Sequence, residues 1–393
     1  MNVTQLHTLI NAVTKEVLGE TGIVQEDLSN VVDIGKTIVD SNNVDNYVKK
    51  LVNHIGKVVF VTRPYMGGVP SVLMDSWEFG SILQKIQADL PVATENESWD
   101  LTDGESYDPN VFYQPTVEAK FFNSKVTFEI PLSFTEKQVK ESFSSAEQLN
   151  GFVSMLVNSV DNAMTVKVDS LIMRTINNFI GETVYDGLYD DTASAIDATV
   201  TSGKAINLLK LYNETADTPI TRENALSDPD FIRFATYQIG LVSSRMERMS
   251  ELFNIKAKAR FTPESDRVTV LLADFAKASN TFLASNTFNK ELVALPKHDI
   301  VPFWQGSGTS YAFDDVSTID IKTASEDIVN FSGIIGVMFD RNALGVTNLD
   351  KRVTTNYNPK AEFYTNFYKF DAGYFNDLSE NFVVFFIGED ETP

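Results

Sequence analysis

The densest group of carboxylates in the chain lies in residues 95–108, ENESWDLTDGESYD, which hold six acidic side chains and no Lys or Arg. Such a group could bind a cation, and Trp99 beside Asp100 and Asp103 could form a platform for a sugar. The same composition is typical of a solvated loop, which is the simpler interpretation. A loop of this length without helices usually belongs to a binding or interaction surface.

The other residues that could do chemistry are scattered. A second acidic group around Asp186, Gly187, Asp190 and Asp191 resembles a calcium loop only loosely, because alternate-residue ligands and a closing Glu are missing. No motif for a nucleophile, a phosphate loop or a metalloprotease accompanies the histidines. The three histidines are His7, His54 and His298. We therefore predict no catalytic residue, no cofactor or cofactor-binding residue and no metal ligand.

Composition excludes further classes of function. The 393 residues carry 54 acidic and 32 basic side chains, a formal charge of −22, which argues against an extensive nucleic-acid-binding surface. Without cysteine there can be no disulfide and no thiolate zinc site. No run of eighteen apolar residues occurs and the N-terminus lacks the features of a signal peptide, so we expect neither a membrane span nor secretion.

The most distinctive segment is the aromatic C-terminal stretch from Arg352 to Ile387. Eleven of the 44 aromatic residues lie between Tyr357 and Phe386, and the pair Asn358-Pro359 predicts a turn within them. Aromatic density of this kind favours extended strands that are buried on at least one face. The segment contains none of the motifs named above, which indicates architecture rather than an active site.

Helical patterns occur at three places that are easily recognised. Residues 4–18 form a short amphipathic pattern, and a capping-box sequence at 144–148 begins a pattern that lasts to Gly181. Asp228-Pro229 combines an N-cap with a favoured first-turn proline and opens a helix that we expect to reach Asn254. The second of these helices is the longest and should be the spine of the fold.

Strand patterns surround these helices. A long strand at 117–134 could return antiparallel to an outgoing one, so that residues 63–134 form an extended two-stranded arm. Further along the chain, strands and a helix alternate as in an α/β domain. These expected elements are strands at 268–272, 292–295, 299–304 and 332–340, with a helix at 274–283.

This order of elements resembles the major capsid protein of tailed bacteriophages, and within that family the small short-tailed (podovirus-type) phages. Two stretches carry the resemblance best: YVKKLVNHIGKVVFVTRP, residues 47–64, and the segment from Phe339 to Ile387. The resemblance covers nearly the whole chain. It implies an α+β fold with an N-arm, an extended (E) loop β-hairpin, a peripheral (P) domain with a long spine helix, and an axial (A) domain of mixed α/β structure.

On this resemblance the chain divides into five parts. The aromatic strands of the last part are expected to pair with the base of the E-loop and to return through the P domain, so that residues 382–387 end in the core of the A domain. The parts are the N-arm 1–56, the E-loop with its flanking strands 57–135, the P domain 136–185, the A domain 186–335 and the C-terminal strands 336–393.

The resemblance also implies a function. The chain would self-assemble into hexamers and pentamers of an icosahedral head that encloses double-stranded DNA, with weak and non-specific contacts to that DNA. Only about 55 residues precede the E-loop, which favours a separate scaffolding protein, and a portal is the other expected partner. The protein would be assembled in the host cytoplasm and would be a virion component, with no enzymatic activity and no membrane partner.

Some members of the family crosslink their subunits through a lysine of the E-loop. Here Lys85, Lys120 and Lys125 lie in the arm, but neither the Asn partner nor the required Glu can be assigned, so the resemblance does not imply crosslinking.

Two alternatives remain open at this stage. An encapsulin-like compartment would share the fold but would enclose cargo enzymes instead of DNA. A carbohydrate-active enzyme or adhesin would use the acidic loop 95–108, although a long spine helix fits a β-sandwich poorly. Deleting residues 67–115 should leave a subunit that does not assemble if the arm serves a shell.

Overall fold

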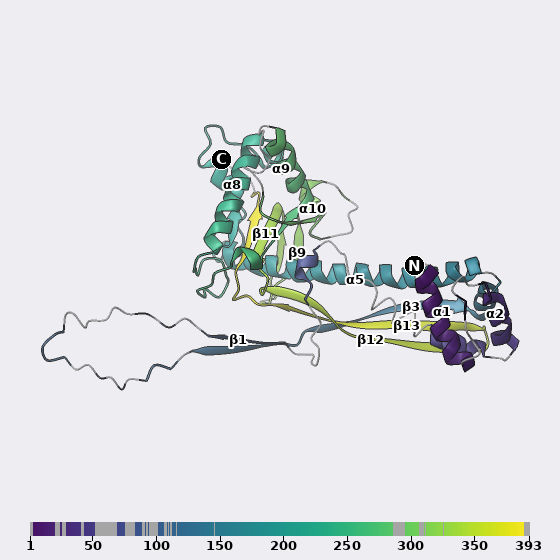
Figure 1. Cartoon of the computed structure of the whole chain (residues 1–393). Helices are drawn as coiled ribbons and strands as arrows, with labels where there is room; N and C mark the ends of the chain where they lie inside the picture. Colours follow the sequence, from purple (N-terminus) through teal and green to yellow (C-terminus); the bar gives the residue numbers. More distant parts are fainter. Residues whose placement is uncertain are drawn as a thin grey trace. The chain divides into compact units, whose positions relative to one another are not determined.

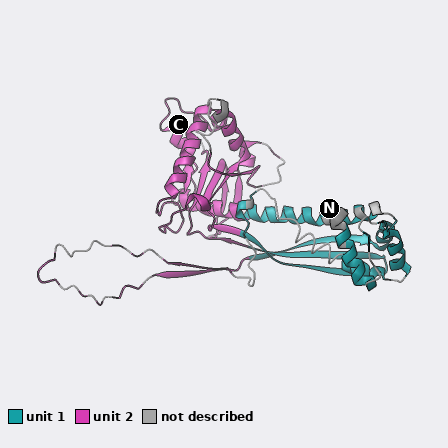
Figure 2. Cartoon of the chain, viewed as in Figure 1, with its two compact units in different colours: residues 1–78, 125–174, 346–373 teal, residues 79–124, 175–345, 374–393 magenta. Residues whose placement is uncertain are grey.

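The computed structural model describes most of the chain, and its contacts divide the chain into two compact units (Figures 1 and 2). The first unit comprises residues 1–78, 125–174 and 346–373, and the second comprises residues 79–124, 175–345 and 374–393. The described residues are 3–19, 24–25, 29–40, 43–51, 69–74, 83–88, 91, 93, 101–105, 108, 110, 112–114, 116–144, 146–285, 295–305, 310, 312–324 and 326–388.

A three-stranded sheet organises the first unit. Its strands lie in the order β12 (Leu344–Asn358), β13 (Phe363–Asn376) and β3 (Lys125–Thr135). β13 pairs antiparallel with β3, from Phe363 opposite Thr135 to Gly373 opposite Lys125. The aromatic C-terminal strands therefore pair with the strand that flanks the predicted E-loop, as the sequence indicated.

The turn between β12 and β13 is the predicted one. The Asn358 side chain accepts the backbone N–H groups of Lys360 and Ala361, at 3.0 and 3.3 Å. An asparagine side chain that replaces a backbone partner in this way is a common means of reversing a chain. β13 begins after this turn, and its aromatic residues Tyr364, Tyr368 and Phe370 are fully buried.

The long helix α5 runs from Ala146 to Leu188, which at 1.5 Å per residue is about 65 Å. It begins where the capping pattern predicts but passes through Gly181, so the expected end there was wrong. A Cβ at Gly181 would lie 3.0 Å from the side chain of Ile321. Glycine is present because another element packs closely against the helix, and not because the helix ends.

The first unit also contains three shorter helices among its described residues. α1 (Val3–Leu18) was predicted, whereas α2 (Val31–Asp40) and α4 (Glu136–Ser142) were not. α4 has a full capping box, in which Thr135 accepts the Gln138 N–H and the Gln138 side chain accepts the Thr135 N–H. Residues 44–51 are also helical.

A five-stranded sheet forms the centre of the second unit, in the order β6-β14-β11-β7-β8. β11 pairs antiparallel with β14 and β7, while β14 with β6 and β7 with β8 are parallel. Every residue of β11 and β14 is buried. The strands are β6 (Ala205–Asn207), β7 (Arg267–Leu272), β8 (Asp299–Val301), β11 (Ile334–Asp340) and β14 (Phe382–Phe386).

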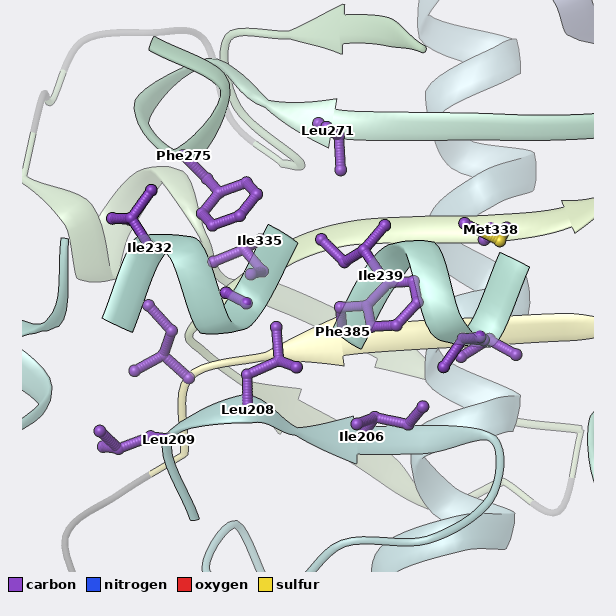
Figure 3. Packing of buried hydrophobic residues seen from close by; sticks show 14 of the residues in the cluster. Ile206, Leu208, Leu209, Ile232, Ile239, Leu271, Phe275, Ile335, Met338 and Phe385 are labelled. Atoms are coloured by element: carbon purple, nitrogen blue, oxygen red, sulfur yellow. The ribbon is translucent and has the colours of Figure 1, made fainter. Parts of the chain in front are cut away.

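Helices cover one face of this sheet and join it in a single apolar cluster (Figure 3). These helices are α6 (Leu208–Asn213), α7 (Arg222–Ala225), α8 (Pro229–Met246) and α9 (Ala273–Ser285). Asp228 caps α8 by accepting the N–H groups of Asp230 and Phe231, as predicted. The helix ends at Met246 and not at Asn254, because the Met246 carbonyl accepts the Thr262 N–H and the chain turns into a bridge between Ser250 and Arg260.

The opposite face of the same sheet is also apolar. The Phe382 ring stacks on Phe179 of α5 at 4.1 Å, and Phe386 meets Phe331 edge-on at 4.9 Å. A strand covered on both faces needs apolar residues at every position, which explains the continuous run FVVFF in β14. Residues 382–387 are thus buried in the core of the second unit.

Smaller elements complete the second unit. The antiparallel hairpin of β1 and β2 lies within the predicted arm, but the single strand predicted at 117–134 is divided into β2 and β3, which belong to different sheets. The predicted strand at 292–295 lies outside the described residues except for Leu295, and the strand predicted at 299–304 is shorter. The smaller elements are β1 (Leu83–Ala88), β2 (Val117–Phe122), β4 (Tyr189–Asp190), β5 (Ala195–Ile196), α10 (Phe313–Val316), β9 (Ile319–Lys322) and β10 (Ile328–Phe331).

Candidate assembly site at the base of the hairpin

The acidic loop gives no support for chemistry in the part that the structure describes. Asp103 and Glu105 are exposed, and Trp99 and Asp100 lie outside the described residues. Among the described residues, no three His, Asp or Glu side chains are grouped so that they could hold a metal ion. A search of the described helices likewise finds none that is long and apolar enough to cross a membrane.

The second acidic group is engaged in local contacts. Asp186 forms an ion pair with Lys204, and Asp190 accepts the Thr192 N–H at 2.7 Å, a hydrogen bond that lowers the pKa of Asp190. Asp186 and Gly187 belong to α5 and not to a loop. These contacts give the carboxylates structural roles.

The described histidines likewise make local contacts. His7 and His298 each place a ring nitrogen within 2.9 Å of a backbone carbonyl oxygen, those of Val24 and Pro296 respectively. His54 lies outside the described residues. The histidines bring no nucleophile or acid together in the part of the chain that the structure describes.

Among the described residues of the second unit, a group of linked charges lies instead against one face of the β1–β2 hairpin. In its register Lys85 stands directly opposite Lys120, and Gln87 opposite Glu118. Like charges at opposite positions of two strands are destabilising unless something neutralises them. The strand pattern therefore requires anionic partners on this face of the hairpin.

The turn that follows β13 supplies these partners. Asp377 accepts from Lys85 at 2.7 Å through one carboxylate oxygen and from Lys120 at 2.8 Å through the other. Glu380 accepts from Lys85 at 2.6 Å and from Gln87 at 2.5 Å. One acidic turn thus binds both strands of the hairpin.

Arg260 completes this group, which we call the base cluster: Lys85, Gln87, Lys120, Arg260, Asp377 and Glu380. The Arg260 guanidinium donates to the Gln87 side chain at 3.0 Å and lies 3.8 Å from Glu380. Three cationic and two anionic side chains therefore meet here. A further carboxylate near this cluster is that of Asp340, at the end of β11. It accepts a hydrogen bond from the Thr262 hydroxyl at 2.9 Å, and burial raises its pKa.

The base cluster is withdrawn from solvent. The Asp377 side chain is 2% exposed and those of Lys85 and Lys120 about a fifth. Burial raises the pKa of Asp377, but hydrogen bonds from Lys120 and Lys85 outweigh it and lower the pKa to about 2. In such surroundings, loss of one partner leaves a buried charge uncompensated, which is strongly destabilising.

Local backbone contacts fix the acidic turn. The Asp377 N–H donates to the Ala343 carbonyl at 2.7 Å, and the Ser379 hydroxyl donates to the Asp377 carboxylate at 2.8 Å. The Asn381 carbonyl accepts the Asp340 N–H at 3.0 Å. The turn is therefore held by the end of β11 and by the residues that follow it, and the hairpin base is connected to the five-stranded sheet of its unit.

The other face of the hairpin has the opposite character. Its side chains are Gln84, Ile86, Ala88, Val117, Ala119 and Phe121, none of which is charged. Ile86, Val117 and Phe121 are 65%, 57% and 63% exposed. We call these six residues the outer face; the hairpin turns its charged side inward and its apolar side to solvent.

Sequence reasoning did not find this site. Lys85 and Lys120 were named only as lysines of the arm for which crosslinking was not implied, and the structure places both in ion pairs. Asp377, Glu380 and Arg260 were missed because they lie far away in the sequence. The available signal was the alternation in β1, where Leu83, Lys85 and Gln87 share one face and Ile86 lies on the other.

Comparison with solved structures identifies the class of fold. A capsid chain of Staphylococcus phage Andhra superposes with a TM-score of 0.51 at 10% identity, over 84% of this chain and 86% of that one. A chain from the structure of the head fiber and inner core protein of native bacteriophage P68 gives the same TM-score at 8% identity, over 83% and 86%. The fold is that of the capsid proteins of tailed phages.

The sequence identifies the family. The profile of the Phi29-like phage major capsid protein family matches residues 10–386, and the chain therefore belongs to that family. No curated protein matches the chain. The protein is a phage major capsid protein, a component of the virion, and its role is structural, as the order of its elements indicated.

Proposed function

We propose that this capsid protein assembles into hexamers and pentamers of an icosahedral head around double-stranded DNA, with the hairpin arm of each copy lying across a neighbour. The observation that carries the proposal is the hairpin itself, fixed at its base by buried ion pairs while its outer face is apolar and exposed. A two-stranded hairpin on its own is marginally stable in water, so an arm of this kind becomes useful when a neighbour covers it.

We also propose how the chain is divided into domains. We assign residues 1–56 to the N-arm, 57–135 to the E-loop and its flanking strands, and 136–185 to the P domain. Residues 186–335 form the A domain in this scheme, and 336–393 return to it. The five-stranded sheet supports the last step, because β14 lies between β6 and β11.

Charge supports weak contact with the packaged DNA. A formal charge of −22 per chain disfavours tight binding to phosphates. Weak binding suits a shell, which has to enclose DNA without binding it tightly at each subunit. We further propose that the shell is assembled in the host cytoplasm, together with a separate scaffolding protein and a portal. The proposal includes no enzymatic activity, as is usual for a structural protein of a shell.

A shortened hairpin tests the role of the arm. Ala88 and Val117 are register partners, so residues 89–116 can be replaced by Asn-Gly, a pair that closes two-residue hairpins well. The base cluster and the outer face of the strands remain in this variant. We expect a folded subunit whose particle yield falls at least about tenfold, since each lost arm removes a contact that the shell repeats many times.

The measurement is negative-stain microscopy of particles from cells that also express the other head proteins of the same phage. The control is the unaltered chain, which should form closed particles that contain DNA. Normal shells from the shortened chain would contradict the role of the arm. Small particles that hold cargo enzymes and no DNA would contradict the enclosure of a genome and favour an encapsulin-like compartment.

A further inference from the structure

A basic loop follows helix α8 in a chain that is acidic overall. Residues 245–261 contain five basic and two acidic side chains, whereas the whole chain has a formal charge of −22. One of the two acids, Glu247, pairs with the buried Arg267 at 3.1 Å. In the part of the chain that the structure describes, no ion pair joins Arg245 or Arg248 to another residue. We call residues 245–261 the basic loop.

Hydrogen bonds within the basic loop hold it in one shape. Ser250 and Arg260 exchange backbone hydrogen bonds of 2.9 and 3.0 Å across it. The buried Asn254 side chain accepts the Lys258 N–H at 2.8 Å and donates to the Lys258 carbonyl at 2.7 Å. The loop therefore presents its outward side chains in fixed places.

The outward side chains of the basic loop are a mixture of cations and apolar groups. Met249, Leu252 and Phe261 are 48%, 65% and 53% exposed, and Arg248 and Lys256 are exposed in the same loop. Exposed apolar groups among polar ones mark protein-binding surfaces, and the charges select a partner of opposite sign. The phosphates of DNA would pair with the cations but would leave the apolar groups uncovered. The loop therefore favours an acidic protein surface that also has apolar groups.

A surface of this kind lies at the other end of α8. The short helices α7 and α10, with the residues at their ends, line a pocket of about 520 Å³ there. Leu226, Ala312 and Phe313 give this pocket an apolar lining, and Glu223 and Asp314 are its exposed acids. We call these five residues the acidic pocket.

The cation of the acidic pocket is already engaged. Arg222 donates to Asp314 and to the Ser332 hydroxyl, both at 2.7 Å. Two further carboxylates, those of Glu214 and Asp217, are exposed in the loop that leads to α7. This end of α8 is therefore acidic and partly apolar, and the end that carries the basic loop is cationic and partly apolar.

From these two surfaces we propose that the basic loop of one copy docks at the acidic pocket of the next copy of this chain. Leu252, the most exposed apolar residue of the loop, enters the pocket, and Arg248 and Lys256 face the carboxylates around it. The inference rests on the proposed shell function. It assigns a contact between copies that uses no residue of the hairpin arm.

The basic loop and the acidic pocket cannot meet within one chain. Helix α8 has 18 residues, a length of about 27 Å, and eight of them are buried in the unit, so the helix holds the two surfaces apart. Complementary surfaces at opposite ends of a rigid element meet only between copies. Such a contact is heterologous, and it closes into a ring when the rotation from one copy to the next allows it. Local attraction of this kind also orients copies whose net charges repel one another.

The first experiment reverses the charges on each surface. The loop variant is Arg248→Glu with Lys256→Glu, and the pocket variant is Asp217→Lys with Glu223→Lys. All four side chains are exposed, so both variants should keep the urea midpoint of the unaltered subunit. Each should lower the particle yield at least about tenfold, because a shell repeats the lost contact many times.

The chain with all four changes decides between charge pairing and simple damage. Its two surfaces are complementary again, with their signs exchanged, and it should recover most of the particle yield. Lys277→Glu, a reversal at an exposed residue of α9, is the control and should assemble like the unaltered chain. The inference is overturned if the fourfold variant assembles no better than the loop variant, or if Lys277→Glu is as defective.

The second experiment identifies which surfaces touch. The chain has no cysteine, so Leu252→Cys and Ala312→Cys each supply a single thiol, the first in the basic loop and the second in the acidic pocket. Particles are assembled from each variant alone and from an equal mixture, and are then treated with a short bis-maleimide. Crosslinked dimers from the mixture, and none from either variant alone, are the expected result, because the contact joins unlike surfaces.

Other outcomes of the crosslinking are equally decisive. Dimers from Leu252→Cys alone would show a symmetric contact, crosslinks to another head protein would assign the loop to a different partner, and particles without crosslinked dimers would show that the surfaces do not meet. Each of these results would overturn the inference. If the unaltered chain forms no particles at all, the proposed shell function fails first. If particles form and only these variants disagree, the contact between loop and pocket alone is wrong.

Discussion

The five-stranded sheet and the β1–β2 hairpin belong to the same unit and are built in opposite ways. All residues of β11 and β14 are buried, while no residue of β1 or β2 is, and exposure alternates along both hairpin strands except at Glu118. The sheet is closed by its own chain on both faces. The hairpin is covered by its own chain on one face only. We infer that the sheet holds the unit together and that the hairpin presents its uncovered face to a neighbouring copy.

The two regions also depend on different forces. Burial of apolar surface stabilises the sheet without fixing the direction of any single contact. The hairpin is anchored by ion pairs from Lys85 and Lys120 to Asp377, whose geometry fixes which face points inward. An element that has to be presented at a defined angle gains from directional contacts more than from a larger apolar core.

The largest expected effect of a single change is at Phe382, in the fully buried sheet. Its ring stacks on Phe179 at 4.1 Å and lies 5.4 Å from Phe339. Phe382→Ala should lower the free energy of unfolding by about 3–5 kcal/mol, because it removes a buried ring and leaves a cavity. Urea denaturation of the unassembled subunit measures this. Tyr237→Ala, on the exposed side of α8, is the control and should cost much less.

A loss below about 1 kcal/mol for Phe382→Ala would show that the sheet does not carry the stability of its unit. The contrast between sheet and hairpin would then lose its energetic basis, since both would be dispensable for folding of the subunit.

The base cluster should give the next largest effect. Asp377→Asn removes the charge that both lysines share and should cost about 3 kcal/mol, as expected when one partner of a buried ion pair is lost. Asp371→Asn is the matched control, because Asp371 pairs with the half-exposed Arg352 and such pairs contribute about 1 kcal/mol or less. Equal losses in the two variants would contradict the special role of the base cluster.

The unaltered chain and the Asp377→Asn variant also give a pH test. Since the pKa of Asp377 is lowered in the folded state from 3.8 to about 2, its ionised form contributes stability above pH 4, and this contribution is lost as pH falls toward 2. The unaltered chain should therefore lose stability more steeply than Asp377→Asn between pH 4 and pH 2. Parallel pH profiles would show that the lysines do not stabilise the carboxylate.

How much of this could be predicted depends on the range of the interactions. The start of α5, the cap at Asp228 and the turn at Asn358 were predicted because each depends on residues within four positions. The pairing of the aromatic β13 with β3 followed from the order of elements in the family. These features depend on local chemistry or on an architecture that persists while sequences diverge.

The errors arose where distant contacts override local patterns. Gly181 indicated a helix end, yet Ile321 packs against it and α5 continues to Leu188. The apolar pattern after Met246 continued toward Asn254, but Thr262 binds the Met246 carbonyl and ends the helix. The base cluster joins residues separated by more than 250 positions, and no local pattern specifies such a partner.

The smallest effect compares one kind of substitution in the two regions. Val337→Thr, at the fully buried centre of β11, places a hydroxyl among apolar side chains and should cost about 1–3 kcal/mol. Ile86→Thr keeps a β-branched residue in the hairpin and should change the stability of the unassembled subunit by no more than about 0.5 kcal/mol, because the side chain is already exposed. The order of the two effects should reverse in assembled particles. There Ile86→Thr should lower the urea concentration at which shells dissociate more than Val337→Thr does, because it weakens the contacts between copies. If Ile86→Thr destabilises the free subunit as much as Val337→Thr does, the outer face is covered by its own chain and the two regions do not differ in the way described.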